Sequence, residues 1–347
     1  MELGIYTFGD AMPDVRTGEA MSTRQRLANL VEQARFADAA GLDVFALGEH
    51  HRRDFAVSAP EVVLAAIAPV TSRIRLSTAV TVLSTQDPVR VYEQFATLDQ
   101  LSGGRAEIIA GRGAFTESFP LFGYDLRDYE ELFDEKIRLL LRLREEEVVT
   151  WSGRTRAPLR DVVVSPRSLQ EKLPVWIGVG GTPQSAVRAG VLGAPMFLAL
   201  FTTPAPGRRL VDLYRRAAEK AGQDLSALRV ASGGHMFIGR TSQGARDAFY
   251  PYYSSYFKLH PQFPGGMPRS MFDQWAASGL LVGSPQEVMD KIMNHRELLG
   301  IDRYVGQFDV GGMPFAMANE SLELFATEVA PVVRQETTDQ VMLGEPA

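Results

Sequence analysis

The sequence predicts an α/β fold, a single (β/α)8 TIM barrel with insertions after its fourth and seventh strands. Strand-like and helix-like segments alternate through eight repeats along the 347 residues, mostly with short connections between them. The chain is also 45% hydrophobic, which is enough to bury one large core. An open, doubly wound sheet is the alternative, but eight regular repeats with strands this short favour a closed barrel.

The first four repeats are defined by apolar runs and by residues that start or stop helices. Their predicted elements are strand 3–8, helix 23–40, strand 43–48, helix 59–71, strand 74–83, helix 88–101, strand 105–110 and helix 128–146. The first of these helices repeats apolar residues with the i, i+3, i+4, i+7 spacing and stops at Gly41. Pro60 and the Asp87-Pro88 pair mark the first turns of the next two helices.

The second four repeats follow a break in this pattern. Residues 147–173 contain Trp151, Gly153 and two prolines, and they predict an insertion with a small hairpin. The later elements are strand 174–179, helix 183–192, strand 194–200, helix 205–221, strand 228–239, helix 284–299, strand 302–309 and helix 316–332. A second irregular stretch, 250–280, is dense in Tyr, Phe, Pro and Gly. We therefore expect one domain over 1–333 and a polar, frayed tail over 334–347.

Composition excludes several classes of function. A formal charge of −6 and a pI near 5.5, without a basic stripe, argue against nucleic-acid binding. The absence of cysteine excludes disulfides, thiolate metal sites and cysteine nucleophiles. The chain begins in a strand-like run rather than a signal peptide, and no window approaches 18 uninterrupted apolar residues. We expect a soluble, cytoplasmic protein.

The strand over 43–48 ends in Gly48-Glu49-His50-His51, and this tetrapeptide is the main candidate for proton chemistry. Histidine titrates nearer neutral pH than any other side chain, so a rim with two imidazoles can move protons. Because side chains alternate along a strand, Glu49 and His51 should project to one side and His50 to the other. One imidazole can then face a cavity while its neighbour supports the loop. The alternative is a polar strand end that meets water.

Two later corners predict an anion site. Gly180 and Gly181 precede Thr182-Pro183, an N-cap and N1 pair, so the free N–H groups of the following helix should point into the barrel mouth. Arg112 lies between two glycines at the end of the preceding strand. Because the two strands are neighbours, both corners can hold one phosphate. The alternatives are an ordinary tight turn and a surface arginine.

Metal chemistry is disfavoured by the histidine spacing. Adjacent histidines on a strand diverge and cannot both ligate one ion, while His235, His260 and His295 have no short-range partner at ligand spacing. We expect His235 to face the mouth and His295 to face solvent.

The run 99–105 should serve as a helix cap and tight turn on the opposite, N-terminal face of the barrel, where residues contribute to stability. No Walker loop or Gly-x-Gly-x-x-Gly follows the first strand, so a Rossmann-type nucleotide site is not supported.

Taken in order, these motifs resemble the bacterial luciferase-like family of flavin-dependent monooxygenases, over about 2–333. The matching segments are 49–51, 77–83, 87–90, 99–105, 111–113, 178–182 and 282–287. The resemblance implies that FMN, or reduced FMN, binds at the C-terminal mouth of the barrel. Its phosphate would be held by Arg112, which follows Gly111, and by the amides of Gly180, Gly181 and Gln184. A non-proline cis peptide bond between Ala79 and Val80 would support the flavin ring.

The resemblance also implies a reaction and partners. Reduced FMN and O2 would form a C4a-hydroperoxyflavin that oxygenates a small organic substrate, with His50 as the catalytic residue and His51 beside it. Segments 115–122 and 250–280 would wall the substrate pocket or form a lid over it. A separate NAD(P)H:flavin reductase would supply the reduced flavin, and the second and third helices would form a homodimer. Gly111 replaces the reactive cysteine of bacterial luciferase itself, which argues against light emission.

Other functions stay open at this point. The same barrel could carry an F420-dependent hydride-transfer oxidoreductase, although a strand ending in Glu-His-His resembles the FMN members more than the F420 members. A non-catalytic flavin-binding protein is the alternative from another class. A metal-dependent barrel hydrolase is a more distant alternative.

Overall fold

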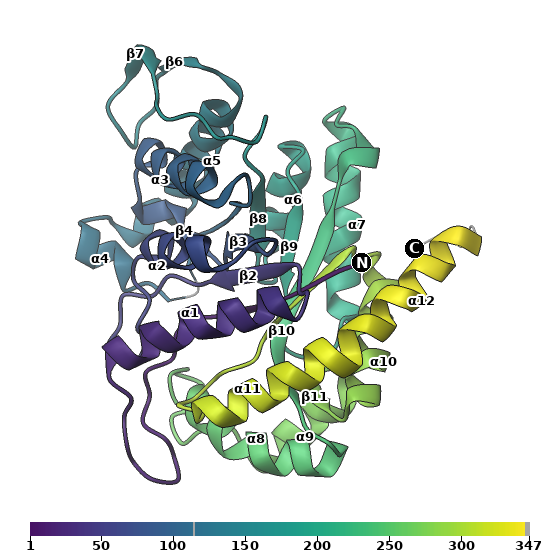
Figure 1. Cartoon of the computed structure of the whole chain (residues 1–347). Helices are drawn as coiled ribbons and strands as arrows, with labels where there is room; N and C mark the ends of the chain where they lie inside the picture. Colours follow the sequence, from purple (N-terminus) through teal and green to yellow (C-terminus); the bar gives the residue numbers. More distant parts are fainter. Residues whose placement is uncertain (114, 344–347) are drawn as a thin grey trace.

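A nearly closed parallel β-barrel forms the centre of the computed structural model, which describes residues 1–113 and 115–343 (Figure 1). Its strands are β1 (Glu2–Thr7), β2 (Val44–Leu47), β3 (Arg75–Thr78), β4 (Thr81–Val82), β5 (Ile108–Gly111), β8 (Val175–Val179), β9 (Met196–Ala199), β10 (Val230–Ile238) and β12 (Arg303–Gln307). Neighbouring strands follow the order β3-β2-β1-β12-β10-β9-β8-β5-β4. Since β3 and β4 are two halves of the third strand, the sheet has eight strand positions, and the predicted (β/α)8 barrel is confirmed.

The third strand closes the barrel by changing partners half-way along. The sequence predicts one strand over 74–83, but the peptide bond between Ala79 and Val80 is cis and separates β3 from β4. The first half pairs with β2, where Thr78 lies opposite Leu47, and the second half pairs with β5. The two edges of the sheet therefore meet on one segment of chain.

Helices surround the barrel (Figure 1). They are α1 (Thr23–Ala39), α2 (Pro60–Ile67), α3 (Pro88–Ser102), α4 (Ser118–Phe122), α5 (Tyr129–Glu145), α6 (Pro183–Val191), α7 (Ala205–Lys220), α8 (Ser242–Phe257), α9 (Arg269–Ser278), α10 (Pro285–Leu299), α11 (Phe315–Leu324) and α12 (Ala330–Leu343). Proline occupies the first turn of α2, α3, α6 and α10, where its fixed φ suits the helix and no N–H is lost. Among the described helices, none is long and apolar enough to cross a lipid bilayer.

The hairpin predicted within 147–173 is confirmed, whereas the stretch 250–280 differs from the sequence prediction. The hairpin of β6 (Val148–Trp151) and β7 (Leu159–Val163) is present and antiparallel, and it follows α5, the helix of the fourth repeat. The stretch 250–280 is not irregular, because it contains the second half of α8 and all of α9, before β11 (Leu281–Gly283) pairs with the end of β10. Phe249, Tyr253 and Phe257 recur every four residues and bury one face of α8, a helical pattern that the high aromatic and proline content obscures.

The predicted frayed tail is helical instead. A π-helical turn over Phe325–Val329 joins α11 to α12, which runs to Leu343. The guanidinium of Arg334 donates to the carbonyl of Gly41 at 2.7 Å and to Asp43 at 2.7 Å, and these contacts hold α12 against the start of the barrel. Residues 344–347 of the predicted tail lie outside the described residues.

The barrel interior holds a small apolar core at its middle. Its buried members, which point inward from the strands, are Tyr6, Val44, Ala46, Ala79, Ile109, Trp176, Phe197, Ala231 and Val305. A much larger apolar layer lies between the sheet and the helices. The interior is therefore a packed layer rather than a channel, as expected for a barrel of this size.

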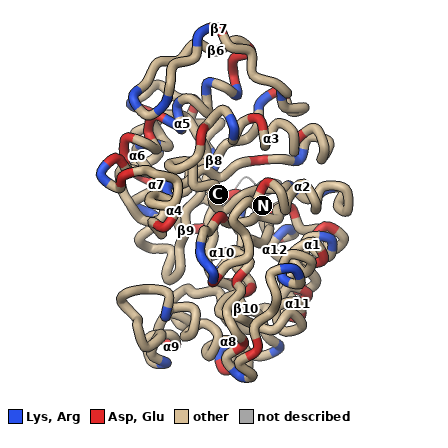
Figure 2. The backbone as a smooth tube through the Cα atoms, turned by 90° about the vertical axis from the view of Figure 1, so that its left-hand side faces the viewer, with Lys and Arg blue, Asp and Glu red and all other residues tan. Residues whose placement is uncertain are grey.

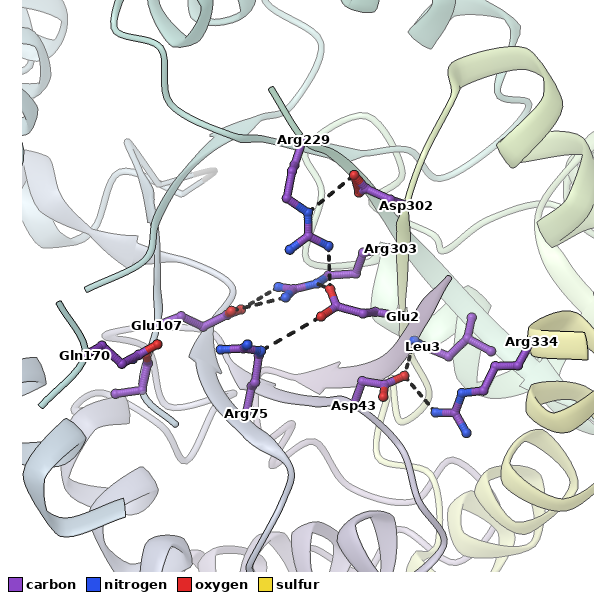
Figure 3. A network of polar contacts seen from close by, with 11 residues as sticks. Glu2, Leu3, Asp43, Arg75, Glu107, Gln170, Arg229, Asp302, Arg303 and Arg334 are labelled. Atoms are coloured by element: carbon purple, nitrogen blue, oxygen red, sulfur yellow. Dashed lines mark hydrogen bonds and ion pairs between the residues drawn. The ribbon is translucent and has the colours of Figure 1, made fainter. Parts of the chain in front are cut away.

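An ion-pair network fills the N-terminal end of the barrel, below this core (Figure 3). Arg303 and Glu107 are each 1% exposed at the side chain and form a two-point pair, with N–O distances of 2.6 and 3.2 Å. Arg303 also donates to Glu2 at 2.8 Å, and its guanidinium lies 4.5 Å from the ring centre of Trp176. Elsewhere acidic and basic residues are interspersed along the chain (Figure 2). The N-terminal end is thus closed by charge pairs, which leaves the C-terminal mouth for ligands.

Candidate active site

His50 lies in an aromatic recess at the C-terminal mouth, just after β2. Its side chain is 8% exposed. The imidazole stacks on Phe55 at 4.4 Å between ring centres and contacts the edges of Phe8 at 4.7 Å and Phe115 at 5.2 Å. The apolar walls on three sides fix the ring and exclude water from it.

Glu117 sets which nitrogen of His50 carries the proton. Its carboxylate lies 3.4 Å from Nδ1 of His50 and accepts from the backbone N–H of His51 at 3.4 Å. Burial alone would raise the pKa of the Glu117 carboxyl, but the hydrogen bond and charge of His50 together with the backbone N–H groups that it accepts from outweigh burial, so the pKa is lowered. A carboxylate can only accept, so Nδ1 is the donor and Nε2 is the free acceptor of the neutral ring.

Glu49 and His51 project away from His50, as the alternation along the strand predicts. His51 Nε2 donates to Glu49 at 2.8 Å. The other carboxylate oxygen of Glu49 accepts from the backbone N–H of Val82 at 2.8 Å and from Gln86 at 2.7 Å. This buried carboxylate ties the end of β2 to the loop after β4, so His51 supports the site while His50 faces the mouth.

The segment with the cis peptide bond lies against two glycines of neighbouring strands. A Cβ on Gly111 would come within 2.5 Å of the Val80 side chain, and one on Gly178 within 3.0 Å. The backbone N–H of Glu49 also donates to the carbonyl of Val80 at 3.2 Å. Val80 therefore connects the corner of His50 with the ends of β5 and β8.

Arg112 reaches the first turn of α6. The sequence predicted that this arginine and this turn lie close together only from the order of the strands. Its guanidinium donates to Ser185 Oγ at 2.9 Å and lies 4.8 Å from the ring centre of Tyr129. It also pairs with Glu130, whose other oxygen accepts from Arg188 at 2.9 Å. The carboxylate of Glu130 thus lies between two positive side chains, Arg112 at the first turn of α6 and Arg188 in its last turn.

The turn before α6 fits an anion. Cβ atoms added to Gly180 or Gly181 would meet nothing within 4 Å, and Gly181 has a φ of +108°, which favours glycine. Thr182 at the N-cap makes no side-chain hydrogen bond to the first turn, and Gln184 within that turn is exposed. The free N–H groups, the helix dipole and Arg112 together suit a phosphate.

His235 forms the opposite wall of the mouth, as predicted. Its ring is 3% exposed, stacks on Phe201 at 4.6 Å and shares a 3.0 Å hydrogen bond with the hydroxyl of Tyr253. Burial lowers the pKa of His235 to about 3, so the ring is neutral at pH 7. His260 lies between Phe257 and Phe115, with ring centres 5.8 and 6.1 Å away, so the stretch after α8 reaches the recess of His50.

His295 was predicted to face solvent, and that prediction is wrong. Its side chain is 1% exposed, and Nδ1 lies 3.1 Å from Ser232 Oγ. Burial lowers the pKa of His295 to about 4. It lies on α10, packed against Tyr304 on the outside of the sheet, so it has no place in the mouth.

Most of the chain matches a known family. The sequence profile of luciferase-like monooxygenases aligns with residues 1–303. The chain belongs to the luciferase-like monooxygenase family. Among curated relatives, this luciferase-like chain is 25% identical to the alkanal monooxygenase alpha chain of the Kryptophanaron alfredi symbiont, covering 91% of this chain and 96% of that one. It is 24% identical to the oxygenase component of the flavin-dependent trigonelline monooxygenase of Acinetobacter baylyi, covering 94% and 95%.

Solved structures of luciferase-like proteins have the same barrel. The monooxygenase RslO1 from Streptomyces bottropensis superposes with a TM-score of 0.83 at 25% identity, covering 95% of this chain and 99% of that one. The oxygenating constituent of 3,6-diketocamphane monooxygenase from Pseudomonas putida, in complex with FMN, gives a TM-score of 0.76 at 22% identity over 95% and 98%. An F420-dependent secondary alcohol dehydrogenase gives a TM-score of 0.74 at 19% identity, covering 96% of this chain and 98% of that one. The last two similarities concern the fold alone.

Proposed function

We propose that this luciferase-like protein is the oxygenase component of a two-component, FMN-dependent monooxygenase. It would use reduced FMN, supplied by a separate NAD(P)H:flavin reductase, and O2 to oxygenate a small organic substrate. Family membership supports flavin-dependent oxygenation in general, and a relative of similar length is named as an oxygenase component. The observation that carries the proposal is the meeting of Arg112 with the first turn of α6, on the same rim as His50.

In this proposal one set of residues at the mouth binds the flavin and another controls proton transfer. Reduced FMN, when bound, supplies the activation of O2. Arg112 and the amides of Gly180, Gly181 and Gln184 would hold its phosphate, while the Ala79–Val80 segment would support the ring. His50 would accept and return a proton at Nε2, because Glu117 fixes the proton on Nδ1. The aromatic walls around His50 would keep water away from the reacting atoms.

The phosphate assignment predicts a selective loss of affinity. Arg112→Ala removes a charged hydrogen-bond donor worth about 1.5–3 kcal/mol, so FMN should bind about 10- to 100-fold more weakly. Riboflavin, which lacks the phosphate, should bind the variant and the wild type with similar affinity. Quenching of flavin fluorescence measures both constants. An equal loss for riboflavin would show that Arg112 does not contact the phosphate.

Glu130 competes with a phosphate for the same guanidinium and predicts the opposite effect. Glu130→Gln keeps the size of the side chain but removes the carboxylate that lies between Arg112 and Arg188. We expect FMN to bind about two- to fivefold more tightly, a gain typical of an exposed ion pair. The same titration tests it, with Asp134→Asn as a control that touches Arg188 but not Arg112. Weaker binding to Glu130→Gln would place the phosphate away from this corner.

Cofactor and assembly are proposals of their own. Titration of the purified chain with FMN and with F420 separates oxygenation from F420-dependent hydride transfer, and the absence of substrate-coupled O2 consumption would leave a flavin-binding protein.

We also propose a cytoplasmic homodimer built on α2 and α3, where Val62 and Leu101 are 64% and 63% exposed. A solution mass of one chain would contradict the dimer.

A further inference from the structure

A cavity of about 340 Å³ lies beside the mouth, between the loop after β1, helix α1 and the start of α11. It adjoins the ends of β1 and β12, whereas Arg112 and the turn before α6 follow β5 and β8. These two pairs of strands lie on opposite sides of the barrel. The cavity is therefore separate from the proposed phosphate corner, and nothing in the proposed oxygenation uses it.

Two buried carboxyl groups line this cavity with one oxygen each unused. Asp10 is 7% exposed and Asp309 is 4% exposed. Oδ2 of Asp10 accepts from the backbone N–H of Gly311 at 2.8 Å, and Oδ2 of Asp309 pairs with Arg26. The Oδ1 atoms of both have no hydrogen-bond partner among the described residues. Buried acceptors without a donor are costly, so a ligand that donates here would be favoured.

The charge of the lining selects the kind of ligand. Asp10, Asp14, Glu19 and Asp309 are acidic, and Arg26 is the basic residue among the lining residues. The guanidinium of Arg26 is already used by protein acceptors: it donates to the carbonyl of Asp10 at 3.0 Å and to Gln33 at 3.4 Å, and it pairs with Asp309. The cavity therefore repels anions and attracts cations.

The rest of the lining is apolar and adaptable. Met12, Met21, Met313 and Phe315 line the cavity, and unbranched thioethers adjust to ligands of different shape. Within the described part of the chain, no group of three or more His, Asp or Glu side chains is arranged to hold a metal ion. An organic cation fits these walls better than an inorganic one.

We propose that this cavity binds a small organic cation, a primary ammonium group on a compact apolar body, held by the carboxyl groups of Asp10 and Asp309. The site lies beyond the proposed oxygenation and stands whether or not the chain uses FMN.

Binding should be linked to release of a proton. Burial and the nearby Asp309 raise the pKa of Asp10 to about 8, against the opposing effect of the Gly311 N–H and Arg26. The hydroxyls of Tyr6 and Tyr256 are the other titratable groups that interact with Asp10, and burial raises both of their pKa values far above neutral, so neither ionises near pH 8. A bound cation favours the ionised form of Asp10. Between pH 7 and pH 9 its affinity should therefore rise severalfold, because the gain from ionised Asp10 exceeds the loss from partial deprotonation of the primary ammonium group near pH 9.

The test uses the full chain without flavin, and benzylammonium is the probe. Benzyl alcohol and benzoate, which have a similar size but are neutral and anionic, are the control ligands. Calorimetric titration at pH 7 and pH 9 should give saturable binding of benzylammonium that strengthens with pH, and no binding of the other two. Asp10→Asn retains an acceptor for the Gly311 N–H, so it should fold, bind about tenfold more weakly at pH 9 and lose the pH dependence. Asp212→Asn, on α7, where the half-exposed carboxylate pairs with the surface residue Arg208, is the matched control and should behave as wild type.

Ala318→Leu gives a second, independent variant, because it fills the cavity without touching a carboxyl group. It should also weaken benzylammonium binding. Equal affinity for benzyl alcohol, or unchanged benzylammonium binding in both folded cavity variants, would overturn the proposal. FMN binding, measured on the same variants, should remain at the wild-type level, so failure here is distinct from failure of the proposed function.

Discussion

Replacing His50 with glutamine is expected to lower the rate of substrate oxygenation by about 10²- to 10⁴-fold, the usual contribution of a positioned general acid–base group. Glutamine occupies similar space in the recess of Phe8, Phe55 and Phe115 but cannot exchange a proton near neutral pH. FMN affinity should change little, because the proposed phosphate contacts lie on other strands. Stopped-flow mixing of the reduced, FMN-loaded enzyme with O2 and substrate measures the rate.

The neighbouring histidine is the natural control for this experiment. His51→Gln keeps a donor for Glu49, whose contacts with Val82 and Gln86 hold the loop. It should therefore retain most of the activity. If His51→Gln lost as much rate as His50→Gln, the imidazole pair would matter only as a support for the loop. Normal oxygenation by His50→Gln would remove His50 from the proton chemistry.

The parts of the site that the sequence predicts are those set by local pattern. The run of apolar residues before Glu49 locates a strand end, and alternation along that strand separates His50 from His51. Glycine and proline likewise locate the turn before α6 and its first residue. Once the strand order of a barrel is assumed, the meeting of Arg112 with α6 also follows.

The remaining contacts depend on chain segments far apart in sequence. Glu117 is 67 residues from His50, and Asp309 is 283 residues from Arg26, so no local spacing connects either pair. Glu117 follows a glycine-rich loop without a periodic pattern, and Asp10 precedes a loop of mixed polar and apolar residues that has no periodic pattern either. The error at His295 has a related cause: a polar residue on a helix predicts exposure unless its buried partner, here Ser232 on β10, is known.

Replacing Arg303 with methionine should cost about 3–5 kcal/mol in the free energy of unfolding, because it leaves the carboxylate of Glu107 buried without its partner. Arg303 and Glu107 are both 1% exposed, so water cannot replace the lost contacts without opening the end of the barrel. Urea unfolding at pH 7, followed by far-UV circular dichroism, measures the change as a lower midpoint. The double variant Arg303→Met with Glu107→Leu should recover most of the loss, since apolar residues often replace a buried pair without penalty.

The acid limb of the stability profile, which is the fall in the free energy of unfolding at low pH, gives an independent check on this ion-pair network. Burial alone would raise the pKa of Glu2, but Arg303, with Arg229, outweighs burial and lowers the pKa from 4.5 to about 2. A carboxyl group with a lowered pKa stabilises the fold above pH 4.5, and this stabilisation is lost as the pH falls towards 2. Arg303→Met removes the main cause of the lowered pKa of Glu2, so the stability of this variant should fall less steeply between pH 4.5 and 2 than that of the wild type.

Arg35→Met, which breaks the exposed pair with Glu32, is the matched control. It should cost at most about 0.5 kcal/mol and leave the acid limb unchanged. An unaltered acid limb in Arg303→Met would mean that the charge of Glu2 is stabilised by Arg229 and Arg75 instead.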